Sequence, residues 1–220
     1  MKVVALLILS CIFSYTLTAQ VLIKAKAGTS ISYLDKIDNV NNWEINRKVR
    51  YGLTAGVALE SNITQKLKLT AELLYTAKGS KYIYHNTIRY VTPTGIYTAP
   101  YLLHKYIFNY LELPLLIKYS FFNNLNVGMG PVIAYLFHAE FIVDGKRRNN
   151  LQMGYPKSDF GLSIDIAYSI NKIEIGTRYV YGLNEITYSG SDPEFYNSGV
   201  KTIGNNKSIQ VYLAYRYKRK

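Results

Sequence analysis

The sequence contains one cysteine, Cys11, and this residue lies among the first twenty. The rest of the chain therefore has no thiol for a disulfide or for a cysteine-based metal site. It also lacks any later run of about 18 apolar residues, the length that a transmembrane helix needs. If the chain crosses a bilayer, it must therefore do so with strands that close into a barrel.

Acidic residues and tryptophan are also scarce. Asp and Glu number 14 against 26 Lys and Arg, and the resulting net charge of +12 favours anions such as phosphates. This positive charge is scattered over several connecting segments instead of following one groove or helix, so we expect no nucleic-acid partner. Trp occurs once and Tyr 22 times. A tyrosine ring with its polar tip suits a boundary between water and an apolar phase.

The first nineteen residues are typical of a secretory signal peptide. Lys2 precedes an apolar run from Val3 to Phe13, and a short polar stretch ends at Ala19. We predict cleavage after Ala19, which gives a signal peptide over residues 1–19 and an exported domain over residues 20–220. Lipoprotein processing at Cys11 is the alternative, but it would leave a very short signal.

Eight segments of about ten or more residues then alternate between apolar and small or charged side chains. They cover residues 21–32, 51–60, 66–77, 106–119, 125–137, 159–170, 172–183 and 207–217. The connections at 61–65, 122–124 and 169–171 are short, whereas those at 33–50, 78–105, 138–158 and 184–206 are long. This pattern predicts an all-β fold, an eight-stranded antiparallel up-and-down transmembrane β-barrel. A soluble eight-stranded ligand-binding barrel is the alternative.

The two faces of each segment differ in chemistry. In KIEIGTRYVYGL, over residues 172–183, Ile173 and Ile175 share one face, and Glu174, Gly176 and Arg178 share the other. We expect the apolar face to contact lipid and the small or charged face to line a lumen that side chains can fill. Isolated charges there would be costly, so they should pair. The predicted lumen charge network comprises Lys24, Lys26, Glu60, Lys68, Glu72, Glu112, Lys118, Asp165, Glu174, Arg178 and Arg216.

Two further features concern the barrel wall. Pro114 cannot donate a ladder hydrogen bond, so we predict a bulge at this position. Many tyrosines fall at outward positions near strand ends, as expected of interfacial aromatic girdles. These are Tyr51, Tyr75, Tyr119, Tyr135, Tyr179, Tyr181, Tyr215 and Tyr217.

The sequence offers little for catalysis. The histidines, His85, His104 and His138, fall in or next to predicted long loops, and a grouping of His138, Glu140 and Ser158 has no supporting motif. Neither a G-x-S-x-G nor an H-E-x-x-H pattern is present. We therefore expect no catalytic site, no cofactor and no metal.

The chain resembles the outer membrane protein beta-barrel domain family, often called porin-like or PorT-like and common in Bacteroidota, with an eight-stranded barrel of the OmpA/OmpX-like kind. The resemblance rests on GLTAGVALESNITQKLKLTAELLYTAKG (52–79), YLELPLLIKYSF (110–121), NVGMGPVIAYLF (126–137), FGLSIDIAYSI (160–170), IGTRYVYGLNEI (175–186) and SIQVYLAYRY (208–217). It implies an eight-stranded barrel in the bacterial outer membrane and little about activity. The chain departs from the usual aromatic last residue, because Lys218-Arg219-Lys220 follows Tyr217.

Several partners follow from this interpretation. We expect outer-membrane lipid around the barrel, and we expect the barrel-insertion machinery to recognise the terminal alternation Ile209, Val211, Leu213, Tyr215 and Tyr217. The basic residues Arg47, Lys48, Arg50, Lys146, Arg147 and Arg148 are candidates for contact with lipopolysaccharide phosphates. An unknown protein partner is also considered.

For function, we predict a structural, envelope or surface-interaction role without catalysis. The alternatives are a narrow channel for ions or small solutes, an accessory of protein secretion, and an enzyme that acts on envelope lipid.

Overall fold

The structure is a computed structural model that describes residues 21–35, 43–86, 89–92, 95–98, 102–122, 124–143, 145–149, 156–187 and 202–217. The predicted signal peptide, residues 1–19, lies outside the described residues. The strands are β1 (Val21–Leu34), β2 (Trp43–Lys48), β3 (Arg50–Asn62), β4 (Leu67–Asn86), β5 (Arg89–Thr92), β6 (Gly95–Thr98), β7 (Leu102–Ser120), β8 (Leu125–Val143), β9 (Lys146–Asn149), β10 (Ser158–Ile170), β11 (Ile173–Thr187) and β12 (Thr202–Tyr217). No helix among the described residues is long and apolar enough to cross a membrane.

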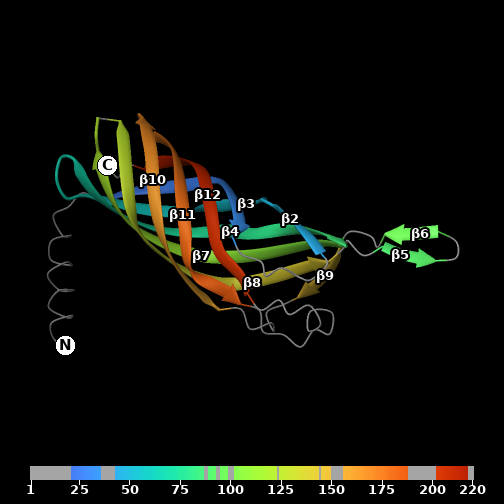
Figure 1. Cartoon of the computed structure of the whole chain (residues 1–220). Coiled ribbons are helices and arrows are strands. Elements are labelled where there is room, and N and C mark those ends of the chain that lie inside the picture. Colours follow the sequence, from blue (N-terminus) through green and yellow to red (C-terminus); the bar gives the residue numbers. More distant parts are fainter. Residues whose placement is uncertain are drawn as a thin grey trace, which may run out of the picture.

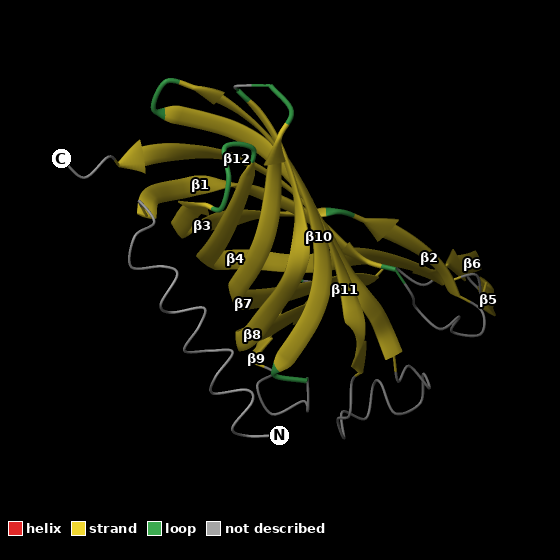
Figure 2. Ribbon diagram, turned by 90° about the vertical axis from the view of Figure 1, so that its left-hand side faces the viewer, coloured by secondary structure: helices red, strands yellow, loops and turns green. Residues whose placement is uncertain are grey.

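Eight of the strands close into a ring (Figure 1). The order around the ring is β1, β3, β4, β7, β8, β10, β11, β12 and back to β1, and every pairing is antiparallel. Figure 2 shows the strands tilted around the wall, as closure of a barrel requires. The predicted eight-stranded antiparallel barrel is therefore confirmed.

The strands extend beyond their predicted ends on the side of the long connections. β4 continues to Asn86, β7 begins at Leu102 and β8 continues to Val143. The predicted long loops also contain short strands, because β2 pairs with β4, β9 pairs with β8, and β5 pairs with β6. Strand–strand hydrogen bonding therefore continues well past the predicted ends of the strands.

The predicted bulge at Pro114 is wrong. Pro114 pairs with Val132 in the regular β7–β8 register, and the register shift in this strand pair lies between Asn109 and Tyr110. The alternation also passes through Pro114 unchanged, because Leu113 and Leu115 face outward on either side of it. The missing N–H of Pro114 therefore leaves the register of the strand pair unchanged.

The outer wall carries a broad belt of exposed apolar side chains. Ile173 is 49 % exposed and Leu213 is 56 % exposed, whereas the neighbouring Glu174 and Arg178 are buried. In water a belt of this extent would be unfavourable, so the barrel requires an apolar surrounding phase. The belt includes Ile23, Leu53, Val57, Leu59, Leu69, Leu73, Leu111, Leu113, Leu115, Ile117, Met129, Ile133, Leu162, Ile164, Ile166, Ile175, Ile209 and Val211.

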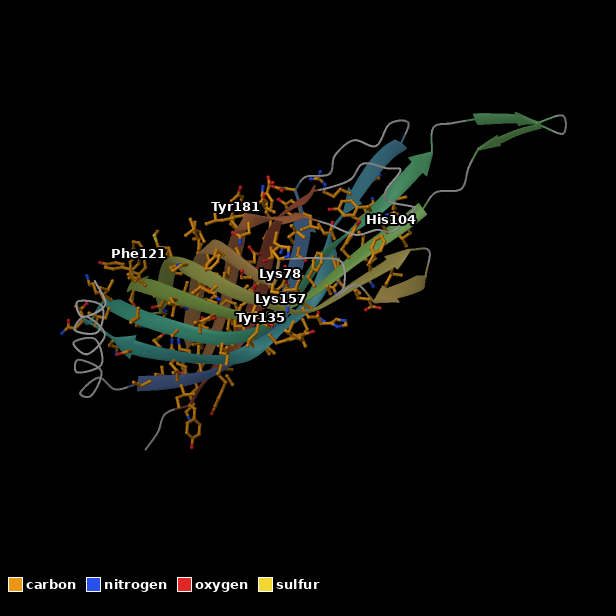
Figure 3. The ribbon with its side chains drawn as sticks, turned by 90° about the horizontal axis from the view of Figure 1, so that it is seen from below. Lys78, His104, Phe121, Tyr135, Lys157 and Tyr181 are labelled. Carbon is orange, nitrogen blue, oxygen red and sulfur yellow. The ribbon has the colours of Figure 1, made fainter. Side chains whose placement is uncertain are left out.

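Aromatic side chains border this belt at both ends. Near the short turns the exposed aromatic residues are Tyr119, Phe121, Phe122, Tyr168, Tyr215 and Tyr217. Near the long connections they are Tyr51, Tyr135, Phe137, Tyr179 and Tyr181. Figure 3 shows Phe121 and His104 at opposite ends of the side chains drawn there, with Tyr181 between them. The two groups have the arrangement of interfacial aromatic girdles.

Beyond the girdle near the long connections, the two faces exchange their chemistry. Tyr82, Tyr106, Phe108 and Phe141 face inward there and are buried. They pack with one another, and the ring centroids of Tyr106 and Phe141 lie 4.7 Å apart. The alternating outward positions include Lys81 and Lys105 together with Ile83, Ile107 and Leu103. An apolar interior beneath an exterior that includes lysines is typical of a sheet that meets water, so we infer that β4, β7 and β8 leave the apolar phase at this level.

Candidate functional site: a filled lumen

The lumen of the barrel holds both positively and negatively charged side chains. All eleven residues of the predicted lumen charge network face the interior. Nine are almost fully buried: Lys24, Lys26, Glu60, Glu72, Glu112, Lys118, Asp165, Glu174 and Arg178. Lys68 and Arg216 are partly exposed. The structure therefore brings together the residue set that alternation alone assigned to the inner face.

Arg178 and Glu72 join opposite walls of the barrel. Arg178 on β11 donates through Nη1 and Nη2 to both carboxylate oxygens of Glu72 on β4, at 2.8 and 2.7 Å. β4 and β11 are four strands apart in either direction around the eight-stranded ring, so this bidentate pair crosses the full width of the lumen. Two parallel charge-assisted hydrogen bonds also fix its geometry.

Other ion pairs connect this bridge to the remaining wall. Arg178 Nε donates to Asp165 at 3.0 Å, and Lys118 Nζ lies 2.8 Å from the other oxygen of Asp165. Lys118 also lies 3.6 Å from Glu174. Lys26 donates to Glu72 at 3.1 Å. The buried charges thus form one connected group, which offsets the desolvation cost that each would incur alone.

The short-turn end of the lumen continues the same network. Lys24 donates to Glu60 at 2.5 Å and to Glu174 at 2.7 Å. Arg216 lies 3.3 Å from Glu174, and Lys68 lies 3.9 Å from Glu60. Every acidic residue of this layer therefore has at least one basic partner.

Tyr212 fills the space beside these charges. Its hydroxyl lies 3.0 Å from both oxygens of Asp165, and the ammonium group of Lys26 sits 3.3 Å from the centre of its ring. A Cβ atom at Gly176 would lie 2.4 Å from Cζ of this ring, so only glycine leaves room for it. Gly176 therefore leaves the space that the ring of Tyr212 fills, and Gly128 leaves space for Lys118 in the same way, because a Cβ there would lie 2.7 Å from Lys118 Cγ.

A second ion pair lies nearer the long connections. Lys78 Nζ is 2.5 Å from Glu112 Oε1, and Thr76 and Gln210 donate to the other carboxylate oxygen. Figure 3 labels Lys78 within the barrel. Sequence reasoning missed Lys78 because it placed this residue in a loop. Every second residue of β4 from Glu72 to Thr76 faces inward, and extending this alternation by two residues would have predicted that Lys78 faces inward too.

Asp159 and Tyr212 were also missed. Asp159 has the same inward parity as Asp165, and it accepts a hydrogen bond from Asn206 at 3.2 Å. Asn206 also donates to the hydroxyl of Tyr110 at 3.0 Å. The alternation of β10 places Asp159 on the inward face, so this residue could have been predicted. Tyr212 was missed because an aromatic residue on a barrel strand was expected to face lipid.

One ion pair lies at the outer end of the barrel. Lys207 is 2.9 Å from Asp35, directly after β1, and Asn205 N–H donates to the same carboxylate at 2.8 Å. Burial alone would raise the pKa of Asp35. The hydrogen bonds from Lys207 and Asn205 outweigh it and lower that pKa overall. Asp35 is therefore held as a carboxylate where the wall meets the long connections.

The histidines and the serine considered for catalysis lie in different settings. His104 packs edge-on against Phe141, with ring centres 5.2 Å apart. The register sets Ser158 opposite Tyr135 and not opposite His138. The side chain of His85 lies outside the described part of the structure. Among the described residues, no group of three His, Cys, Asp or Glu side chains could hold a metal ion.

The basic residues considered for lipopolysaccharide contact lie in different settings. Arg47 and Lys48 are exposed on β2. Arg50 is half-buried and donates to the carbonyl of Lys78 at 2.8 Å, so it supports the wall. The backbone of residues 146–148 forms part of β9, and their side chains lie outside the described part of the structure.

A closed antiparallel ring with an apolar belt, two aromatic girdles and a polar lumen defines an integral β-barrel membrane protein of the outer-membrane type. The sequence model of the outer membrane protein beta-barrel domain family matches residues 17–188, and the chain belongs to this family. Membership of this family places the protein in the bacterial outer membrane.

Solved outer-membrane proteins have a similar fold at low sequence identity. OprG from Pseudomonas aeruginosa is 13 % identical with a TM-score of 0.49, over 91 % of this chain and 97 % of OprG. Neisserial surface protein A is 12 % identical with a TM-score of 0.43, over 91 % and 97 %. Ail, the attachment invasion locus protein of Yersinia pestis, is 12 % identical with a TM-score of 0.42, over 90 % and 97 %. No curated protein matches the sequence.

Proposed function

We propose that the protein is a closed, non-conducting and non-catalytic barrel with a structural or surface-interaction role in the outer membrane. The observation that carries this proposal is the bidentate pair of Arg178 and Glu72, because it joins opposite walls across the lumen. Lys118, Asp165 and Tyr212 occupy the space beside it. An eight-stranded barrel has an interior just wide enough for such side chains to fill it.

A surface role is supported by the part of the barrel that stands beyond the outer girdle. There β4, β7 and β8 continue as a sheet joined by β2 and β9, with an aromatic interior of its own. A sheet that buries Tyr82, Phe108 and Phe141 is stabilised by packing, and it can present fixed side chains at the cell surface.

Conductance measurements in planar lipid bilayers test the closed lumen. We expect the wild-type barrel to show no steady open state. The double variant Glu72→Ala with Arg178→Ala removes the cross-lumen bridge and should conduct. The matched control is Glu60→Ala with Lys68→Ala, which removes one acid and one base from neighbouring strands β3 and β4 without opening the crossing.

Steady conductance by the wild-type barrel would contradict the proposal and favour a narrow channel. Equal conductance by the two double variants would show that the Arg178 bridge does not close the lumen.

Absence of catalysis is tested separately, by mass spectrometry of lipid A from cells with and without the protein. A covalent change that depends on the protein would overturn that part of the proposal.

A further inference from the structure

Three lysines lie in one row on the outward face of the sheet beyond the girdle. The register sets Lys48 on β2 opposite Lys81 on β4, and Lys81 opposite Lys105 on β7. Tyr82 and Tyr106, the residues next to Lys81 and Lys105 in sequence, are buried on the inner face. Alternation therefore directs the lysines outward, where Lys48 is exposed and the other two are half-exposed.

The row lacks compensation within the described part of the chain. Like charges directly opposite each other on neighbouring strands are destabilising. None of the three lysines makes an ion pair with another residue that the structure describes. The lysines of the lumen each have an acidic partner, whereas these three cations lie opposite one another in the register, so an external anion would stabilise them.

The height of the row identifies the source of that anion. Tyr75 and Leu111 pair at the upper edge of the apolar belt, and Lys81 and Lys105 pair six residues further along the same two strands. With a rise of about 3.3 Å per residue and a strand tilt near 40°, the row stands about 15 Å above that edge. The long connections of outer-membrane barrels are extracellular. This height therefore corresponds to the sugar and phosphate layer above the acyl chains of the outer leaflet.

The residues around the row also favour a lipid over a soluble acidic partner. Ile107 lies two residues from Lys105 towards the belt, and Leu103 lies two residues beyond it, and both face outward. Leu103 is 39 % exposed. The basic row is thus continuous with the apolar wall below it, and a molecule with acyl chains and anionic sugars matches both parts.

We propose that Lys48, Lys81 and Lys105 bind phosphate groups of lipopolysaccharide in the outer leaflet. A phosphate presents several strong acceptor oxygens, and lysine contacts it as a mobile point charge with three donors. Three cations in register over neighbouring strands, which lie about 4.8 Å apart, can share one or two such groups. This inference does not depend on a closed lumen, so failure of the conductance proposal would leave it standing.

The test uses the mature barrel in lipid nanodiscs and measures how lipopolysaccharide raises its thermal unfolding temperature. A ligand that binds only the folded state raises this temperature, and at a fixed ligand concentration the increase is larger for a lower Kd because the stabilisation follows the logarithm of 1 + [L]/Kd. We expect stabilisation by phosphorylated lipopolysaccharide, and much less by the same lipopolysaccharide after enzymatic dephosphorylation. The variant Lys81→Gln with Lys105→Gln should bind at least about tenfold more weakly, because two charge-assisted contacts are lost.

The matched control is Lys66→Gln with Lys172→Gln, which removes two exposed lysines from the short-turn end. This control should keep the full response to lipopolysaccharide, and the response of the wild type should fall with added salt. A full response in the Lys81 and Lys105 variant, or equal stabilisation by dephosphorylated lipopolysaccharide, would overturn the proposal. Stabilisation by a soluble acidic peptide and not by lipopolysaccharide would instead assign the row to a protein partner.

Discussion

The bridge between Arg178 and Glu72 should dominate the stability of the barrel interior. Arg178 is fully buried and donates two hydrogen bonds to Glu72 and one to Asp165. Arg178→Met keeps most of the volume but removes the charge, which leaves the two carboxylates with only Lys26 and Lys118 as basic partners. Removing one partner of a buried ion pair costs about 3–5 kcal/mol, and we expect a loss of this size.

The assay is equilibrium unfolding by denaturant of the barrel in lipid vesicles, followed by circular dichroism and extrapolated linearly to zero denaturant. The companion variant combines Arg178→Met with Glu72→Gln. It removes one charge of each sign, and the glutamine oxygen can still accept a hydrogen bond from Lys26. We therefore expect the double variant to lose less stability than Arg178→Met alone, which is a coupling between the two sites.

Two results would refute this reasoning. A loss below about 1 kcal/mol for Arg178→Met would mean that water or another side chain replaces the guanidinium, since a buried carboxylate without its partner is expected to cost more. Purely additive effects of Arg178→Met and Glu72→Gln would mean that the two side chains do not interact in the folded barrel.

Three further predictions address the packing, the outer rim and the lipid face. Gly176→Leu should destabilise the barrel by about 1–3 kcal/mol in the same unfolding assay, because the new side chain would displace the ring of Tyr212. Asp35→Asn should reduce the free energy of unfolding at pH values above about 3.9, the ordinary pKa of a carboxyl group. Folding lowers the pKa of Asp35, so the greater stability of the wild type should disappear as the pH falls through that lower pKa. Measurements of unfolding midpoint against pH check this, and an advantage that persists in acid would exclude Lys207 as its cause. Leu213→Arg should cost about 2–4 kcal/mol, since Leu213 lies in the middle of the apolar belt, and a neutral result would place this face outside the bilayer.

The sequence predicted the barrel well because two environments act on every strand. Lipid requires apolar side chains at outward positions such as Ile164 and Ile175, and a narrow lumen requires small or paired residues such as Gly176 and Asp165. Both requirements have a period of two, so they reinforce the same alternation. The parity of a residue then decides which side of the wall it faces.

Parity could not predict which charges meet. The contact of Arg178 with Glu72 joins strands that share no backbone hydrogen bond, and it depends on the tilt and register of the whole ring. Tyr212 shows a second limit. An aromatic residue on a barrel strand was expected at the lipid face, but the absence of a side chain at Gly176, on the adjacent strand, leaves a space inside the wall that fits its ring.

The ends of the strands were mispredicted for a related reason. The rule that apolar residues face outward holds only where lipid is the solvent. In β4 the inward positions change from Glu72 to Tyr82, while the outward positions change from Leu73 to Lys81. Read with the lipid rule, the stretch after Ala77 ceases to look like a strand, although its backbone pairing with β7 continues to Tyr84.

The point at which the inward and outward side chains of β4 change their chemistry therefore marks the membrane surface within a continuous strand. The backbone ladder runs on unchanged, and only the preferred chemistry of each side reverses between Thr76 and Tyr82. Below the reversal the interior is ionic because lipid surrounds the wall, and above it the interior is aromatic because water does. The lysine row of Lys48, Lys81 and Lys105 lies just past the reversal. We propose that these outward cations bind lipid phosphates at this level, and the proposal would link the reversal of the two faces to the ligand of the barrel.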